Sequence, residues 1–274
     1  MSDEEEGPAG QGVVLSRRRL LYLSAAALAG GASVALLPRG PEPSPRWEAA
    51  PKGPAGMAGP RVTSTGDGTR PLPVRARPVY RVHDLLPAAG ASAVALTVDD
   101  GPDPHWTPQV LALLARYRVR ATFSLIGRQA HAHPDLARRV LAEGHAICNH
   151  TMTHPLTFAR GNPPEIRRQV VDAQSAIVDA TGEAPRLFRA PAGIWSPTVL
   201  QTAAGNGMVP IDWNVDPRDW SRPGTAHIVR RMLATRPGDI VLCHDGGGNR
   251  AETVQALGTV LPFLLDRGLT FITL

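Results

Sequence analysis

Two pairs of residues in the sequence have the types and the spacing of a metal site. His150 and His154 are four residues apart, so on one turn of helix, or on a helix-like loop, both imidazoles point the same way. Asp99 and Asp100 are adjacent carboxylates. Two imidazoles and a carboxylate make an open site for zinc or a similar divalent ion, with a further position left for water. Each pair alone is weak evidence, because paired histidines occur on surfaces and Asp-Gly-Pro also forms ordinary turns.

Alternating strand and helix patterns predict how these residues are positioned. Short apolar, β-branched runs predict strands at 93–98, 121–126, 146–148, 187–189, 209–213, 240–242 and 270–274. Helical spacing predicts one helix that begins at Thr107 and others at 134–143, 164–181, 197–206, 226–234 and 253–267. Repeated strand-then-helix units imply a parallel sheet or barrel. Polar residues that follow the strands then gather at one rim.

Five strand ends carry unusual polar strings, and together these strings resemble the polysaccharide deacetylase family, the NodB-homology carbohydrate esterases. The family motifs T-F-D-D-G-P, H-[ST]-x-x-H-P, R-x-P-[YF]-G, D-x-x-D-W and L-x-H correspond in order to residues 97–102, 150–155, 189–193, 216–220 and 242–244. Val98 replaces the phenylalanine of the first motif, and Ala192 stands where many members have an aromatic residue. The resemblance covers residues 78–274 and implies an α/β fold, a distorted (β/α) barrel of about seven units.

The resemblance also implies a ligand set and a substrate-binding set. Asp100, His150 and His154 would hold a divalent metal, most simply zinc, with cobalt as the alternative. The acetyl group and the sugar would contact residues in or next to the third, fourth and fifth motifs, namely Pro191, Ala192, Trp195, Trp220 and Leu242.

The same resemblance implies an acid and a base that face each other across the substrate. Asp99 would be the general base, held ionised by Arg189. His244 would be the general acid, and Asp219 would fix its tautomer and keep it protonated. An amine leaves poorly unless it is protonated, which is why the acid is needed.

The implied reaction is removal of N-acetyl groups from an amino-sugar polysaccharide, peptidoglycan or a chitin-like oligosaccharide, with release of acetate. Three alternatives stay open at this point. One is an O-acetyl esterase that acts on xylan or wall glycan, and another is an inactive relative that only binds glycan. The third is a glycosidase that uses Asp99 with a second carboxylate.

The first 77 residues have the composition of a targeting segment and a tether. Residues 20–37 are uncharged and follow Ser16-Arg17-Arg18-Arg19, the layout of a twin-arginine export signal. We expect residues 1–37 to be this signal or an uncleaved membrane anchor, residues 38–77 to be a Pro/Gly-rich linker and residues 78–274 to be the catalytic domain. The protein is then exported and extracellular, or associated with the wall or membrane.

The composition of the chain limits the classes of partner that it can be expected to bind. The chain has 274 residues, 43% of them hydrophobic, and a formal charge of +5, so it can bury a core. Its basic residues, all arginine except Lys52, are scattered along the sequence rather than clustered, which argues against nucleic-acid binding. We expect a monomer. Cys148 and Cys243 are expected to be small buried residues, with a disulfide as the alternative.

Overall fold

Seven parallel strands form the framework of the domain. The computed structural model describes residues 71–274; the expected signal and most of the expected linker lie outside them. The strands are β1 (Ala93–Asp99), β2 (Thr122–Leu125), β3 (Ala146–Asn149), β4 (Leu187–Phe188), β5 (Val209–Pro210), β6 (Ile240–His244) and β7 (Thr270–Phe271). Six of them follow the order β5-β4-β3-β2-β1-β6, and β7 pairs with β1. A parallel sheet wrapped by helices was the architecture predicted from the sequence.

The segment after β5 spans the open side of this curved sheet. Val215 bridges Val241 of β6 in parallel register, and Val79 bridges Ile211. The amide of Leu242 donates to the carbonyl of Val215 at 2.9 Å. The closure is irregular because only single residues pair here, which agrees with a distorted (β/α) barrel.

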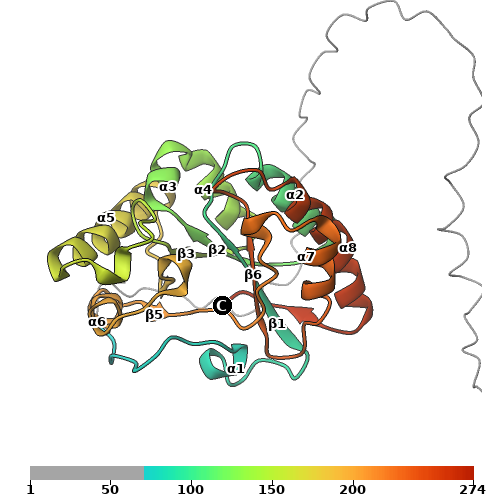
Figure 1. Ribbon diagram of the computed structural model, residues 1–274, viewed down its shortest axis with the longest axis horizontal. Coiled ribbons are helices and arrows are strands. Elements are labelled where there is room, and N and C mark those ends of the chain that lie inside the picture. The colour runs from blue at the N-terminus through green and yellow to red at the C-terminus, as the bar shows by residue number, and fades with distance from the viewer. Residues whose placement is uncertain (1–70) are drawn as a thin grey trace, which may run out of the picture. The chain divides into compact units, whose positions relative to one another are not determined.

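Helices cover the outside of the sheet (Figure 1). They are α1 (Val82–Leu85), α2 (Thr107–Tyr117), α3 (Gly127–Ala132), α4 (Pro134–Ala142), α5 (Pro163–Thr181), α6 (Pro197–Gly205), α7 (Thr225–Met232) and α8 (Ala251–Asp266). The four-residue α1 and the six-residue α3 were not expected from the sequence. In the described part of the chain, no helix is both long and apolar enough to cross a membrane.

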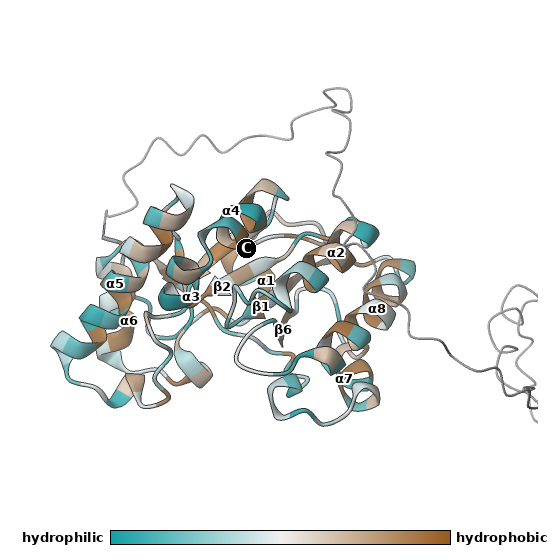
Figure 2. Ribbon diagram, turned by 90° about the horizontal axis from the view of Figure 1, so that it is seen from above, coloured by the Kyte–Doolittle hydropathy of each residue, from teal (hydrophilic) through white to brown (hydrophobic). Residues whose placement is uncertain are grey.

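The longest helix illustrates why these elements form. Asn162 caps α5 by accepting from the amide of Glu165, whose side chain accepts from the amide of Asn162 in return; this is a capping box. Ile166, Val170 and Ile177 recur at helical spacing on the buried face, as predicted. Apolar residues face the strands while hydrophilic residues lie mostly on outer helix surfaces and loops (Figure 2).

The chain already lies against the domain before the expected boundary at residue 78. The amide of Leu72 donates to the carbonyl of Ala204 in α6 at 2.8 Å. Leu72 also lines a shallow hollow with Met208 and Pro210. The last residues of the expected linker therefore run along α6 and β5.

Candidate active site

The end of β1 brings two adjacent carboxylates to one side. Asp99 is the last residue of a strand whose seven residues are all buried. Asp100 follows with a left-handed φ of 77°, which turns its side chain away from the alternation of a regular strand. Asp99 Oδ2 then lies 3.7 Å and Asp100 Oδ1 3.6 Å from Nε2 of His150.

The two histidines lie on an irregular loop after β3. Thr151 and His154 both have left-handed φ values, 65° and 56°, so the helical turn considered from the spacing does not form. Asn149 Oδ1 accepts from the amide of Thr151, and Thr151 Oγ1 accepts from the amide of His154. These bonds fold the loop so that the imidazole centroids of His150 and His154 are 4.8 Å apart.

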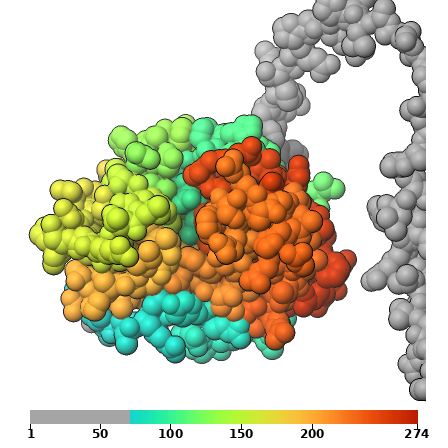
Figure 3. All heavy atoms as spheres, viewed as in Figure 1, coloured from blue at the N-terminus to red at the C-terminus, as the bar shows by residue number. Residues whose placement is uncertain are grey.

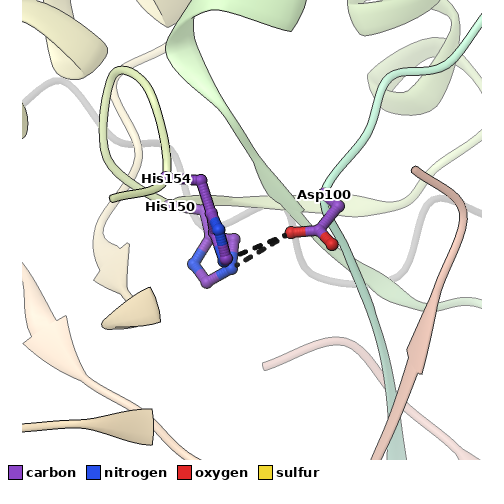
Figure 4. A group of neighbouring side chains, drawn as sticks. All are labelled: Asp100, His150 and His154. Carbon is purple, nitrogen blue, oxygen red and sulfur yellow. Dashed lines mark ion pairs between the residues drawn. The ribbon is translucent and has the colours of Figure 1, made fainter. Parts of the chain in front are cut away.

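The donor set fits a divalent metal. Ligand atoms of Asp100, His150 and His154 all lie within 4.8 Å of one another (Figure 4). His150 Nδ1 lies 2.8 Å from the carbonyl oxygen of Arg189, which can only accept, so Nδ1 carries the proton and Nε2 presents its lone pair to the site. Burial lowers the pKa of His150 and keeps the ring neutral. Asp100 Oδ1 is buried and, in the described part of the chain, has no hydrogen-bond partner, which suits a metal ligand.

Arg189 holds the other aspartate. It is fully buried, and its Nη1 donates to Asp99 Oδ1 and to Thr97 Oγ1, each at 2.8 Å. Its Nη2 donates to the carbonyl of Asp212, and the guanidinium lies 5.5 Å from the ring centroid of Trp213. Burial opposes charge on Asp99, but the Arg189 guanidinium, together with smaller contributions from His150 and His244, outweighs burial and holds the pKa of Asp99 below its usual value.

His244, the last residue of the neighbouring strand β6, forms a second buried pair with Asp219 of the segment after β5. Asp219 Oδ1 lies 2.7 Å from His244 Nδ1, while its Oδ2 accepts from the His244 amide and the Thr253 hydroxyl. Burial disfavours the imidazolium, yet the Asp219 carboxylate outweighs it and raises the pKa of His244 to about 9. Asp99 and His244 are directly paired in the register of β1 and β6, so the two pairs meet at one strand edge.

The residues expected to bind substrate divide into exposed and buried groups. Ala192 is exposed, with a left-handed φ of 55°, on a short 3-10 turn that includes the buried Pro191. Trp220 is 48% exposed. Leu242 is buried in β6, and Trp195 is half-buried, with Nε1 donating to Asp212 Oδ2 at 2.8 Å.

Backbone strain collects on these same loops. Seven described non-glycine residues have positive φ values, and six of them lie on the loops after β1, β3, β4 and β5: Asp100, Thr151, His154, Ala192, Arg218 and Arg222. Such conformations are costly and cluster at functional sites. In the space-filling view a cleft separates the segment after β3 from the segment after β5 (Figure 3).

Three residues near the site were not singled out from the sequence. Asp212 and Trp213 hold Arg189 and Trp195, but the sequence pattern placed them inside a strand that in fact ends at Pro210. Asp245 is fully buried, and the Thr107 hydroxyl donates to it at 2.5 Å. Burial raises the pKa of Asp245 to about 7. Its place directly after His244 was the available signal.

Both cysteines are free and buried. This agrees with the expectation that they are small buried residues rather than a disulfide. Burial raises the pKa of the Cys148 thiol to about 12 and that of Cys243 well above its usual value. Neither thiol is poised to react.

Comparisons with known proteins agree with this geometry. The sequence model of a family described as polysaccharide deacetylase matches residues 87–211. The chain is 50% identical over 191 residues to a chitooligosaccharide deacetylase of Sinorhizobium fredii, covering 65% of this chain and 88% of the relative. It is 43% identical to a peptidoglycan-N-acetylglucosamine deacetylase of Bacillus cereus, over 66% of this chain and 85% of the relative.

Solved structures give the same result. A crystal structure of a peptidoglycan N-acetylglucosamine deacetylase superposes with a TM-score of 0.65 at 35% identity, covering 68% of this chain and 87% of that one. A family 4 carbohydrate esterase from Streptomyces lividans, in complex with acetate, gives a TM-score of 0.62 at 31% identity, over 67% of this chain and 93% of the other.

Proposed function

Because the chain belongs to the polysaccharide deacetylase family and is a polysaccharide N-deacetylase, we propose that it uses a divalent metal to remove N-acetyl groups from a polymer or oligomer of N-acetylglucosamine. Relatives named for chitooligosaccharide and for peptidoglycan N-acetylglucosamine support this substrate class. The released products are acetate and a free amine on the sugar.

Asp100, His150 and His154 are the proposed metal ligands. The unpartnered Asp100 Oδ1 and the Nε2 lone pair of His150 support this assignment. Zinc suits two imidazoles and one carboxylate, and cobalt is the alternative. When bound, such an ion would polarise the acetyl carbonyl and make an attacking water more acidic.

Asp99 is the proposed general base. Arg189 keeps its carboxylate ionised and aims it, while Oδ2 stays within 3.7 Å of the proposed ligand His150. The carboxylate takes a proton from the attacking water as the carbon–oxygen bond forms.

His244 is the proposed general acid. Its Nδ1 is bound to Asp219, which leaves Nε2 as the proton donor to the leaving nitrogen. The pKa near 9 keeps this proton in place at neutral pH. An alcohol leaves more easily than an amine, so a strongly protonated acid favours the N-deacetylase over the O-acetyl esterase.

The loop after β4 supports the developing oxyanion and the acetyl group. The strained turn exposes Ala192, and its backbone N–H is the proposed donor to the oxyanion. Trp220, Leu242, Pro191 and Trp195 are the proposed walls around the acetyl methyl and the sugar face.

One observation carries the proposal most directly. The carboxylate held ionised by Arg189 and the imidazole held protonated by Asp219 are register neighbours on β1 and β6. A base and an acid kept in opposite protonation states beside a metal ligand set are what amide hydrolysis requires.

The testing experiment measures acetate release from N-acetylglucosamine oligomers, purified peptidoglycan and acetylated xylan in parallel. Each assay runs with chelator, without it, and after zinc or cobalt is restored. We expect acetate from at least one amino-sugar substrate, lost with chelator and recovered with metal. Acetate from xylan alone would favour the O-acetyl esterase, and chelator-resistant activity would contradict the metal.

The expected location remains part of the proposal. We propose that residues 1–37 are a twin-arginine-type signal or membrane anchor and that residues 38–77 are a linker. Together they would place the domain outside the cytoplasm near a wall polymer. Fractionation of cells that produce the full chain, combined with protease accessibility of the domain, tests this location. The same measurement is made on a variant that carries both Arg17→Lys and Arg18→Lys. Unchanged export of that variant would exclude the twin-arginine route.

A further inference from the structure

Four exposed arginines gather on the side of the cleft that carries Trp220. They lie on the loop after β5 and on α7, and we call them the arginine rim: Arg218, Arg222, Arg230 and Arg231. Within residues 216–231 the acids are Asp216 and Asp219. Asp219 is buried against His244, and Asp216 Oδ1 accepts from the backbone amide of Arg218. The segment therefore presents an excess of positive charge to solvent.

The guanidinium groups of the arginine rim have no acidic partner. Among residues 71–274, no rim arginine forms an ion pair. The two arginines of α4 behave differently, because Arg138 pairs with Asp135 and Arg139 with Glu143. The charge of the rim is thus available to a partner, whereas that of α4 is internally neutralised.

The arginine rim is continuous with the proposed active site. The guanidinium of Arg218 lies 5.3 Å from the ring centroid of Trp220, which directly follows Asp219. Arg231 Nε donates to the carbonyl of Asp216 at 3.4 Å, so its head reaches the same loop. This arrangement places free cations beside Trp220, one of the proposed walls of the substrate site.

A hollow adjoins the arginine rim at Arg222. It has a volume of about 470 Å³ and is lined by Ser221, Arg222, Asn249, Ala251 and Glu252. Glu252 Oε2 accepts from the amide of Gly224 at 2.9 Å, so the lining carries one carboxylate and one guanidinium, that of Arg222. A hollow of this polarity can admit a hydrophilic substituent of the sugar chain.

From these observations we propose that the arginine rim binds carboxylates carried by the glycan, so that the preferred substrate is an anionic, peptide-substituted amino-sugar polymer rather than a neutral oligosaccharide. The inference rests on the proposed function and narrows its substrate class. Unpaired surface cations raise the local concentration of an anionic polymer and speed its encounter, and salt weakens the effect.

The test compares three substrates with one triple variant of the full chain. Arg222→Gln, Arg230→Gln and Arg231→Gln are combined, and Arg218 is left in place because it contacts Trp220. The substrates are soluble peptidoglycan strands with their stem peptides, the same strands with carboxylates converted to amides, and the neutral tetramer of N-acetylglucosamine. Acetate release gives kcat/KM for each at low and at physiological salt.

We expect the wild-type protein to prefer the native strands over the amidated ones, and to lose that preference as salt rises. The triple variant should lose at least about threefold in kcat/KM on native strands, the loss expected from three exposed ion pairs. Its kcat/KM on amidated strands and on the tetramer should stay unchanged. Arg138→Gln with Arg139→Gln removes two paired arginines and should change none of these values.

Several results would overturn the inference. Equal losses on native and amidated strands would mean that the rim acts on the neutral sugar or on folding. Unchanged turnover of native strands by the triple variant would mean that the rim does not serve this substrate. That conclusion holds whether or not the triple variant also loses binding to anionic phosphatidylglycerol vesicles. Absence of acetate from every substrate would instead reject the proposed function itself.

Discussion

At the scale of single residues, two neighbouring aspartates have different surroundings. Asp99 Oδ1 accepts a hydrogen bond from Arg189. Asp100 Oδ1 is buried and has no hydrogen-bond partner in the described part of the chain. The first carboxylate is held as a charged base, and the second is free to coordinate. Identical side chains are thereby separated in role by their environment.

Replacing the proposed base should separate metal binding from turnover. Asp99→Asn keeps the shape of the side chain and all three proposed ligands, but its amide cannot take a proton. We expect kcat to fall by about 100-fold or more, with metal content per protein unchanged. Turnover near the wild-type level would overturn the assignment of Asp99, and loss of metal would show that Asp99 is itself a ligand.

Replacing the partner of the proposed acid should move the alkaline limit of activity. The pKa of His244 is raised from 6.5 to about 9, so the acid form is present below that pH and is lost as pH rises through it. Asp219→Asn removes the charge that raises the pKa. The alkaline limb of kcat/KM should therefore move to lower pH, by about one unit or more.

The alkaline limbs of kcat/KM are compared for the wild-type protein and Asp219→Asn with the same metal bound. The metal must be the same because a bound cation lowers the His244 pKa in both proteins. Asp266→Asn removes an exposed acid at the end of α8 and should leave the limb in place. An unmoved limb in Asp219→Asn would assign the titration to a group other than His244.

At the scale of elements, the loop between β6 and α8 is packed against the Asp100 turn. A Cβ at Gly246 would lie 2.2 Å from the backbone oxygen of Asp100. A Cβ at Gly101 would meet Asp245 Oδ1 at 2.4 Å. The ligand turn and the loop after His244 therefore fit only because glycine occupies both contacts.

Gly246→Ala should weaken metal binding without touching a proposed ligand. The backbone of Asp100 must move to admit the methyl group, and misplacing a ligand by its support typically costs about 10- to 100-fold in metal affinity. Titration with zinc against a competing chelator measures this.

The matched control is Gly258→Ala in the middle of α8. Its Cβ would meet Leu113 at an ordinary 3.9 Å, and alanine is favoured over glycine in a helix by about 1 kcal/mol. We expect normal metal affinity and a higher melting temperature. Equal metal affinity in the Gly246 and Gly258 variants would show that the Asp100 turn is not held by this contact.

Long elements with a clear periodicity were predictable, and short elements set by tertiary contacts were not. The buried face of α5 follows from its own spacing. By contrast, α3 begins at Gly127, where a Cβ would lie 2.7 Å from the backbone of Ala173 in α5. No local pattern encodes that approach.

The candidate site divides in the same way. The motif strings located the carboxylates, histidines and Arg189, because each lies at the end of a predicted strand or in the loop that follows it. Asp212 and Asp245 carry no motif of their own. Their importance comes from contacts with Trp195 and Thr107, residues that are distant in sequence, and only the folded chain brings these together.

At the scale of the whole molecule, the proposed ligands connect separate parts of the sheet. Asp100 follows β1, whereas His150 and His154 follow β3, with β2 between the two strands. The site exists only when this sheet is formed, because the unfolded chain separates the ligands by 50 residues. A metal that binds only the folded state must then stabilise the whole domain.

Zinc should therefore raise the melting temperature of the metal-free protein. Ligand at 100 times its dissociation constant contributes about 2.7 kcal/mol, which for a domain of this size corresponds to about 5–10 °C. His150→Ala removes one ligand and should lose most of that increment, whatever its own metal-free stability. His105→Ala removes an exposed histidine outside the ligand set and should keep the full increment. Because each variant is compared with and without zinc, general destabilisation cancels, and an undiminished increment in His150→Ala would place the ion elsewhere in the chain.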